Sequence, residues 1–476
     1  MVRRDVVQLL KEEIARGVAP GFCSGTACPI AVRSAPGRLD VLGGLGAESG
    51  GTVAQMALPA RVGVAVQLRD EPQLVIRSEQ IVPPVGRGEV TLELDSFYTQ
   101  GTLIPATEVP ALVAGARSWI TPITALWHIL LSAWPKGPMG GTVLIRGEVP
   151  MGAGQASSTA LLTAMLLAVC ESRRITMEAE EQAQWIQRAE MLSNQGLEMR
   201  GGTGHILDAL TSLLAAPSAM LRYSTQPYRL AGPVPVPVDV RVLAMDTGVR
   251  YTSAREALEE LRIAGTMGRR IIETIYTDLG QRHTPLHGYL ANTSPLLYRQ
   301  YFRMLLPKRM RAQDFVRAYG PLPEGSELVE AGRLYRVRTA VDHLIAEHEH
   351  AEQFLQAMEE LADLPAGEGA NPERQKILQR AGRLALASHH SYRLRLELSC
   401  READWLVDRL MEAGPERGIF GARITGCGGG GTVMALVDRS SVAGDAVLEV
   451  MKAYHQVTGL ALGIAEAGAG GSLWGR

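Results

Sequence analysis

The sequence lacks any surplus of positive charge. Its 48 lysine and arginine residues stand against 50 aspartate and glutamate residues, which gives a formal net charge of -2. A protein whose main partner is a nucleic-acid backbone normally carries a basic surplus, because it must neutralise the phosphates that it contacts. We therefore expect no nucleic-acid partner, and any bound anion must be held by a local site.

Cysteine is also scarce, and no long hydrophobic run is present. The five cysteines are scattered and form no CxxC pair of the kind that holds zinc, so reduced thiols and a cytoplasmic location are expected. The apolar run 161–170 is only about half of a membrane span. Apolar residues in the segment 1–17 recur at helical spacing and build no signal-peptide core, so we expect neither secretion nor membrane insertion.

The proportions of hydrophobic and charged residues are ordinary for a folded protein of more than one domain. Of the 476 residues, 46% are hydrophobic and 21% are charged, which is enough for a large core. The segment AGPVPVPVDV (231–240) is rich in proline, which disfavours helix, and it leads into a buried strand. We therefore predict a domain junction there, with one domain over residues 1–235 and another over 236–476.

Local patterns predict a mixture of helices and strands. Alternating β-branched residues predict strands, and apolar residues at helical spacing predict helices. The expected strands are 62–69, 73–78 and 141–149, and the expected helices are 157–172, 177–192, 254–276 and 332–361. A loop rich in glycine and proline is expected at 362–375, and a strand–loop–strand unit at 422–438.

The stretch PMGAGQASSTA (150–160) has the character of a phosphate-binding loop. Its glycines let backbone amides converge on a ligand, and the helix that follows offers unpaired N–H groups and a partial positive charge. Its hydroxyl side chains can cap the helix, contact phosphate oxygens or ligate a Mg²⁺ ion that bridges phosphates. A core helix that is merely N-capped after a tight turn is an equal alternative on these residues alone.

Two more segments are crowded with small residues. TGCGGGGT (425–432) has five glycines in the six positions from Gly426, so another backbone or a ligand must come close, or several residues need positive φ. SAPGRLDVLGGLGAESGG (34–51) places small residues around Arg38 and Asp40. A lone Arg–Asp pair is usually a surface salt bridge, but three such segments in one chain favour a functional site.

Taken together, these motifs resemble those of the GHMP kinases, the superfamily of galactokinase and of homoserine, mevalonate and phosphomevalonate kinases. APGRLDVLGG, PMGAGQASSTA and ITGCGGGGTV occur here in the family's order. Within the superfamily the chain is most similar to galactokinase- and L-arabinokinase-like sugar-1-kinases, from about residue 35 onwards. The resemblance implies a two-domain α+β fold, with an N-terminal domain like domain 2 of ribosomal protein S5 and a C-terminal ferredoxin-like domain. The active site would lie between them.

The resemblance implies ATP as phosphate donor and Mg²⁺ as cofactor. Ser158 and a glutamate on the next helix would hold the metal, and Glu190 is the expected glutamate, with Glu198 as the alternative. Asp208 would be the catalytic base, and Arg38 would keep its carboxylate ionised. The expected nucleotide-binding residues are Pro150, Gly152, Ala153, Gly154, Gln155, Ala156, Ser157, Ser158 and Thr159.

The acceptor side departs from the family pattern. Galactokinases continue the first motif with Glu-His-Thr-Asp-Tyr, whereas this chain has Gly-Leu-Gly-Ala-Glu at 44–48, and Leu258 stands where relatives have a tyrosine. The expected substrate-binding residues are Gly44, Leu45, Glu48, Asp246, Gly428 and Gly429. We expect the acceptor to be a monosaccharide. We expect the protein to be a monomer or a homodimer. A different polyol, and a degenerate nucleotide-binding sensor, remain alternatives.

One further segment, HLIAEHEHAEQF (343–354), contains three histidines among glutamates. It has no HExxH pattern. We therefore predict a solvated, charged helix face and no metal site.

Overall fold

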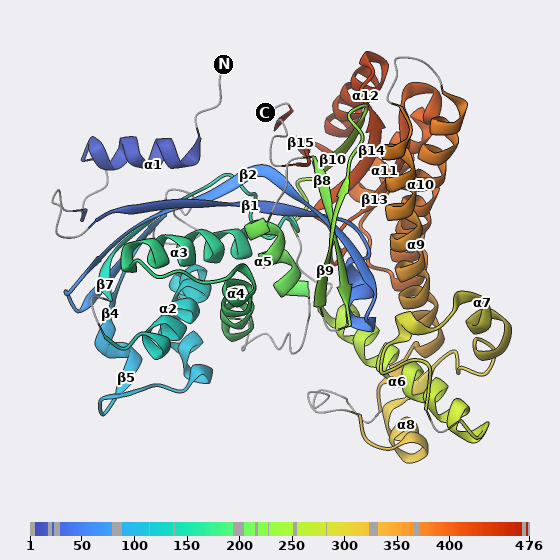
Figure 1. Ribbon diagram of the computed structural model, residues 1–476, viewed down its shortest axis with the longest axis horizontal. Helices are drawn as coiled ribbons and strands as arrows, with labels where there is room; N and C mark the ends of the chain where they lie inside the picture. Colours follow the sequence, from blue (N-terminus) through green and yellow to red (C-terminus); the bar gives the residue numbers. More distant parts are fainter. Residues whose placement is uncertain are drawn as a thin grey trace.

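Two large β-sheets, each packed against helices, form the framework of the described residues (Figure 1), and two short two-stranded sheets accompany them. The computed structural model describes residues 5–17, 21–22, 29–78, 88–113, 115–136, 139–193, 204–214, 218–226, 228–250, 255–281, 283–322, 332–365, 371–468 and 473–474. Within these ranges no helix is long and apolar enough to cross a membrane. Glu198, the alternative metal ligand expected from the sequence, lies outside these ranges.

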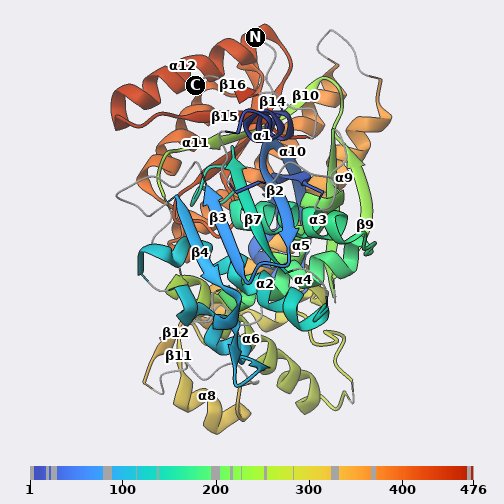
Figure 2. The same ribbon diagram turned by 90° about the vertical axis from the view of Figure 1, so that its left-hand side faces the viewer.

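The first sheet has strand order β4-β3-β7-β2-β8-β9, with β1 paired to β2. Figure 2 shows β4, β3, β7 and β2 side by side in this order. All pairs are antiparallel except β3 with β7. Its strands are β1 (Ala31–Leu42), β2 (Thr52–Arg69), β3 (Gln73–Ser78), β4 (Glu89–Glu93), β7 (Gly140–Gly147), β8 (Ala219–Thr225) and β9 (Tyr228–Pro235).

A group of helices covers one face of this sheet, and helix α1 lies on the other (Figure 1). The larger group consists of α2 (Thr121–Ala133), α3 (Ser157–Arg173), α4 (Ala179–Ser193) and α5 (Gly204–Leu214). Helix α1 (Val6–Ala15) packs Leu10 against Ala65 and Leu144 on the opposite face. The expected helices at 157–172 and 177–192 thus match α3 and α4 closely.

The second sheet has strand order β13-β14-β10-β15-β16, all antiparallel. Its strands are β10 (Val240–Asp246), β13 (Ile419–Ile424), β14 (Thr432–Asp438), β15 (Gly463–Glu466) and β16 (Leu473–Trp474). The long helices of this half are α6 (Arg255–Asp278), α9 (Val337–Asp363), α10 (Pro372–His390), α11 (Arg401–Ala413) and α12 (Ser441–Thr458).

The remaining elements are short. They are η1 (Gly44–Ser49), η2 (Leu94–Phe97), β5 (Tyr98–Thr99), β6 (Thr102–Leu103), η3 (Ala106–Val113), η4 (Gly115–Ile120), η5 (Leu290–Asn292), α7 (Pro295–Leu297), η6 (Tyr298–Phe302), β11 (Met310–Arg311), α8 (Ala312–Tyr319), β12 (Leu334–Tyr335), η7 (Ser391–Leu396) and η8 (Pro415–Arg417). Helix α9 begins at Val337, later than the helix expected from 332, because β12 precedes it.

The chain passes from one sheet to the other at the Pro/Val-rich segment, where β9 ends at Pro235 and β10 begins at Val240. One buried core bridges the two halves. It combines Leu39 of β1 with Phe354 of α9 and Met434 of β14. The first and third glycine-rich motifs can therefore face one another across a packed interface.

Candidate active site

The loop between β7 and α3 presents the start of a helix without a side-chain cap. Gly152 and Gly154 have φ of 69° and 73°, and the N-cap residue, Ala156, is itself left-handed with φ of 56°. Ala156 makes no side-chain capping hydrogen bond to the first turn of α3. The alternative of a conventionally N-capped helix is therefore wrong. Unpaired amides at the start of a helix are available to bind an anion.

The hydroxyl groups of this turn bind a buried carboxylate instead of the helix backbone. Ser158 Oγ and Thr159 Oγ1 both donate to Glu190 Oε1, at 2.8 and 2.7 Å, and Glu190 is 2% exposed. The fold thus brings together the residues named for the metal, from α3 and α4. A hydroxyl and a carboxylate oxygen are hard ligands of the type that Mg²⁺ takes beside substrate phosphates.

Arg38 and Asp208 form a two-pronged ion pair. Arg38 Nε lies 2.6 Å from Asp208 Oδ1 and Nη2 lies 2.8 Å from Oδ2, across 170 positions of sequence. Gln55 Nε2 also donates to Asp208 Oδ1 at 2.8 Å. Burial disfavours the charged guanidinium, but the charge and hydrogen bonds of Asp208, together with the nearby charge of Asp40, outweigh it and raise the pKa of Arg38 above its usual value. The carboxylate is therefore held in one orientation by three donors.

This pair is fixed directly to the phosphate-type loop. Arg38 Nη1 donates to the carbonyl of Gly154 at 2.6 Å, and the backbone N–H of Arg38 donates to the carbonyl of Gln155 at 3.0 Å. A Cβ on Gly37 would lie 2.8 Å from that same Gln155 oxygen. The first and second motifs therefore pack backbone against backbone, which explains the glycine in APGR.

The third glycine-rich loop closes on the second motif from the other side. Thr432 Oγ1 donates to the carbonyl of Ala153 at 2.8 Å, and Gln155 Nε2 donates to Thr432 Oγ1 at 3.0 Å. A Cβ on Gly431 would lie 2.5 Å from the carbonyl oxygen of Ala153. Of the alternatives expected for these glycines, the close approach of another backbone is confirmed at Gly431, where that backbone is the phosphate-type loop.

Gly428 and Gly429 face a different neighbour. A Cβ on Gly428 would lie 2.1 Å from the carbonyl oxygen of Leu398, and the N–H of Gly429 donates to that oxygen at 3.0 Å. Every glycine of this loop has positive φ, from 60° at Gly426 to 138° at Gly430. Packing against Leu398 thus accounts for Gly428 and Gly429 independently of a substrate.

The expected acceptor segment forms the short helix η1. The side chain of Leu45 packs in the core of the second half, so a contact from Leu45 to a substrate would have to use its backbone. Gly44 has no room for a side chain, because a Cβ there would lie 2.2 Å from Asp40 Oδ2. Glu48 is exposed. The residues at both positions are therefore explained by packing, Gly44 against Asp40 and Leu45 in the core of the second half.

Asp246 ends strand β10 and is paired within its own turn. Its carboxylate accepts from Arg250 Nη1 and Nη2 at 2.7 and 3.0 Å and from the N–H of Gly248. Arg250 in turn lies against the phosphate-type loop, since a Cβ on Gly152 would lie 3.4 Å from Arg250 Cδ. Sequence reasoning missed Arg250, although the four-residue spacing of DTGVR was a usable signal for this ion pair.

Cys427 is a second residue that was missed. Its side chain reaches solvent, yet protein atoms crowd around it, and its electrostatic neighbours are Arg38, Asp208, Asp40 and Glu48. Desolvation by these atoms raises the pKa of the Cys427 thiol to about 11, opposed by Arg38 and assisted by Asp208. An accessible thiol therefore borders the Arg38–Asp208 pair.

The prediction of a solvated charged face at 343–354 is wrong for its inner residues. His343 and Glu347 are 0% and 1% exposed, because this side of α9 is covered by η1, η7 and α10. Burial lowers the pKa of His343 to about 4, so its ring is neutral. Among the described residues no group of three or more His, Cys, Asp or Glu side chains could hold a metal ion.

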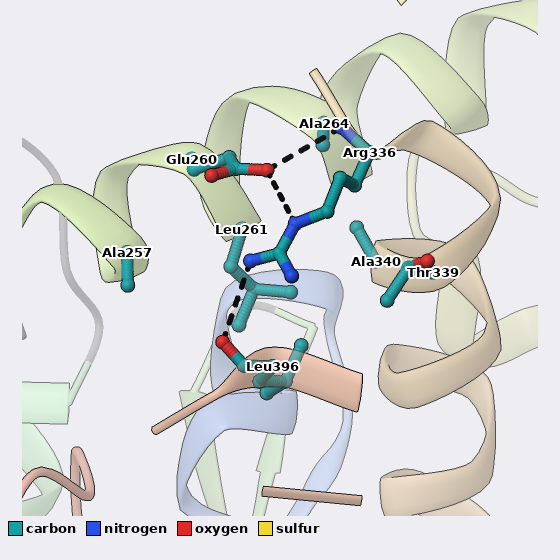
Figure 3. Close-up of a pocket in the computed structure, with 8 residues that line it drawn as sticks. All are labelled: Ala257, Glu260, Leu261, Ala264, Arg336, Thr339, Ala340 and Leu396. Atoms are coloured by element: carbon teal, nitrogen blue, oxygen red, sulfur yellow. Dashed lines mark hydrogen bonds and ion pairs between the residues drawn. The ribbon is translucent and has the colours of Figure 1, made fainter. Parts of the chain in front are cut away.

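A small pocket lies at the junction of α6, α9 and η7 (Figure 3). Arg336 crosses it, donates from Nε to Glu260 Oε1 at 2.9 Å, and reaches the carbonyl of Leu396. Its other lining residues are mostly apolar. This pocket is filled by an internal ion pair and shares no residue with the converging glycine-rich loops.

Two family models match the chain. The model of the GHMP kinases N terminal domain matches residues 123–215, and the model described as GHMP kinases C terminal matches residues 374–456. The chain therefore carries segments that match both GHMP kinase domains, and it has the two-domain fold of the GHMP kinase superfamily, with mixed helices and sheets.

Individual relatives point to the sugar kinases within it. The chain is 23% identical to L-arabinokinase of Arabidopsis thaliana over 90% of its own length, but it spans only 45% of that relative. It is 28% identical to galactokinase of Chloroflexus aggregans, covering 87% of this chain and 85% of that one. The crystal structure of Lactococcus lactis galactokinase complexed with galactose superposes with a TM-score of 0.68 and 19% identity, over 99% of this chain and 100% of the other.

Proposed function

We propose that the protein is an ATP-dependent kinase that transfers the γ-phosphate to a hydroxyl group of a monosaccharide, giving a sugar phosphate and ADP. The observation that carries this proposal is the Arg38–Asp208 pair, held within hydrogen-bond reach of the loop that would carry the triphosphate. The anomeric hydroxyl of an L-arabinose- or galactose-like sugar is the favoured acceptor, because the named relatives are galactokinases and an L-arabinokinase.

The donor side uses the backbone from Gly152 to Ser158. Amides of the loop and of the first turn of α3 would bind the phosphate oxygens, together with the positive end of the helix. Ser158 and Glu190 would hold Mg²⁺, which supplies charge neutralisation on the phosphates when bound. The expected loop residues Pro150, Gln155 and Thr159 would act by shaping this loop and orienting Glu190.

Asp208 would act as general base. Its carboxylate would take the proton of the acceptor hydroxyl while that oxygen attacks the γ-phosphorus and the bond to ADP breaks. Arg38 pairs with this carboxylate and would place positive charge next to the transferring group. Gln55 fixes the orientation of Asp208 and is itself held by Thr211 Oγ1 at 2.7 Å.

The two halves of the site would come from two domains, residues 1–235 and 236–476. The first carries Arg38, the phosphate-type loop and Asp208, and the second carries the third glycine-rich loop. Support comes from the placement of β9 and β10 in different sheets. Glu48, Cys427 and the backbone of Gly44, Gly428 and Gly429 would then border the acceptor.

A second candidate is a kinase of the same mechanism that acts on a non-sugar alcohol. Its support is the segment 44–48, where neither Gly44 nor Leu45 offers a polar side chain to read sugar hydroxyls. ADP release with ATP, Mg²⁺ and a panel of aldoses, sugar alcohols and mevalonate-like alcohols separates the two. Turnover of a reducing sugar but not of its 1-O-methyl glycoside supports transfer to the anomeric hydroxyl. Turnover confined to other alcohols contradicts it, and the absence of any turnover favours a nucleotide-binding sensor.

A further inference from the structure

Three charged side chains meet in the interior beside the acceptor segment. Asp40 of β1, Glu347 of α9 and Arg423 of β13 are 1%, 1% and 0% exposed. Arg423 Nη2 lies 3.3 Å from Glu347 Oε1, and Nη1 lies 3.8 Å from Asp40 Oδ2. The guanidinium also stacks over the ring of Tyr392 at 5.2 Å. The three come from distant parts of the sequence, and we call them the interior triad.

The interior triad binds the backbone of two loops. Arg423 Nη1 donates to the carbonyl of Val41 at 3.0 Å, and Glu347 Oε1 accepts from the N–H of Gly43 at 3.2 Å. Val41 and Gly43 lie within the three residues that precede η1, which is the expected acceptor segment. Asp40 Oδ2 accepts from the N–H of Gly426 at 3.0 Å, in the third glycine-rich loop. Each member therefore fixes one backbone position at the acceptor side of the site.

A second layer fixes the triad itself. Ser388 Oγ lies 2.7 and 3.0 Å from the two oxygens of Glu347 and accepts from Arg423 Nε at 3.2 Å. Tyr392 donates its O–H to the carbonyl of Gly426 at 2.9 Å. None of the hydrogen bonds or ion pairs of Glu347 and Arg423 given by the structure reaches residues 150–159 or Asp208. Glu347 and Arg423 thus contact the segment before η1, and Asp40 contacts the third glycine-rich loop at Gly426.

Stability alone does not explain this arrangement. Burying two carboxylates and a guanidinium costs several kcal/mol per ion in desolvation, and apolar residues of similar volume often give an equally stable interior. What apolar residues cannot do is bind the three backbone groups of Val41, Gly43 and Gly426. Directional hydrogen bonds from a crowded interior hold a loop within the small tolerance that a reacting group requires.

We propose that Glu347 and Arg423 are positioning residues, which with Asp40 set the acceptor segment 44–48 relative to the third glycine-rich loop. This positioning role rests on the proposed function where it is tested by enzyme kinetics. Loss of the triad misplaces the acceptor while the donor loop keeps its own contacts. Acceptor binding and transfer fall, and ATP binding is retained.

The test is Glu347→Gln, which keeps the side-chain volume and one carbonyl acceptor but removes the charge opposite Arg423. We expect the acceptor KM to rise at least about 10-fold, with the ATP KM within about 2-fold of the original protein. Glu359→Gln is the matched control, because Glu359 lies on the same helix and forms a partly exposed ion pair with Arg222. It should leave both constants unchanged.

Tyr392→Phe is a milder second variant. It removes only the O–H group that binds the Gly426 carbonyl, and it leaves the ring against Arg423. A smaller rise in acceptor KM, again without change for ATP, is expected. Unchanged acceptor KM in both variants, or equal rises for acceptor and ATP, would overturn the positioning role.

Hydrogen exchange measured by mass spectrometry gives a readout that needs no turnover. In Glu347→Gln, amides in peptides covering 41–50 and 425–431 should exchange at least about 10-fold faster, while peptides covering 157–170 keep their rates. Unchanged exchange at 41–50 contradicts the triad's role whatever the reaction is. Failure of the original protein to phosphorylate any acceptor, with the exchange pattern as expected, counts against the proposed function only.

Discussion

Arg38 donates two hydrogen bonds to Asp208, from Nε at 2.6 Å and from Nη2 at 2.8 Å. Its third guanidinium nitrogen, Nη1, donates to the carbonyl of Gly154. One guanidinium therefore connects a carboxylate of α5 with the loop that precedes α3. The orientation of the carboxylate relative to that loop follows from this single side chain.

Asp208→Asn should abolish most turnover without loss of ATP binding. The amide keeps the shape but cannot take a proton, so we expect kcat to fall by about 10²–10⁴-fold. Steady-state kinetics give kcat, and titration with ATP gives its Kd. Asp342→Asn is a matched control. Asp342 lies on α9 and accepts two hydrogen bonds from the guanidinium of Arg303, at 2.8 and 2.9 Å, as Asp208 does from Arg38. Equal activity of Asp208→Asn and the control would remove Asp208 as the base.

Glu190→Gln should raise the Mg²⁺ requirement. The buried carboxylate loses its charge while the hydroxyls of Ser158 and Thr159 can still hydrogen-bond to the amide oxygen. We expect the Mg²⁺ concentration for half-maximal rate to rise about 10- to 100-fold. Glu180→Gln, on the same helix but bound at the surface to Tyr228, should not change it. An unaltered Mg²⁺ dependence in Glu190→Gln would argue for another metal ligand.

Gly431→Ala should impair the donor side through backbone crowding. The new Cβ would lie 2.5 Å from the carbonyl oxygen of Ala153, and the residue has φ of 81°. Gly459→Ala is the control, since Gly459 has φ of 71° and open space around its Cβ position. Both variants should lose roughly 1 kcal/mol of unfolding free energy from the left-handed backbone. Only Gly431→Ala should raise the ATP KM, and equal ATP KM values in the two would refute this.

Alkylation of Cys427 should inactivate the protein slowly at neutral pH and faster at high pH. Only the thiolate reacts, and the pKa of this thiol is raised to about 11, so the rate should rise about 10-fold per pH unit from pH 8 to 10. The inactivation rate with iodoacetamide is the measurement, and a bound acceptor should slow it. Cys427→Ala should resist. Rapid inactivation at pH 7, or inactivation of Cys427→Ala at the original rate, would contradict the prediction.

Local patterns predicted the parts of the site that depend on neighbouring residues. The start of α3 at Ser157, the strand–loop–strand around 425–432 and the need for close backbone approach at its glycines all followed from turn chemistry and periodicity. The resemblance of three motifs then named Arg38, Ser158, Glu190 and Asp208 for one site, and the structure brings them together in the pairs Arg38–Asp208 and Ser158–Glu190.

The sequence by itself thus determined which backbone segments turn, which helices and strands form, and which chemical groups the loops carry. Burial was decided only by tertiary structure, because a charged helix face is solvated or buried according to what packs on it. The local sequence around Glu347 predicts a surface residue, but η1 and α10 pack against α9 and bury it. Likewise, Asp40 lies two residues from Arg38, yet it binds Gly426 and lies beside Arg423. Those partners are almost 400 positions away, beyond the reach of any local pattern.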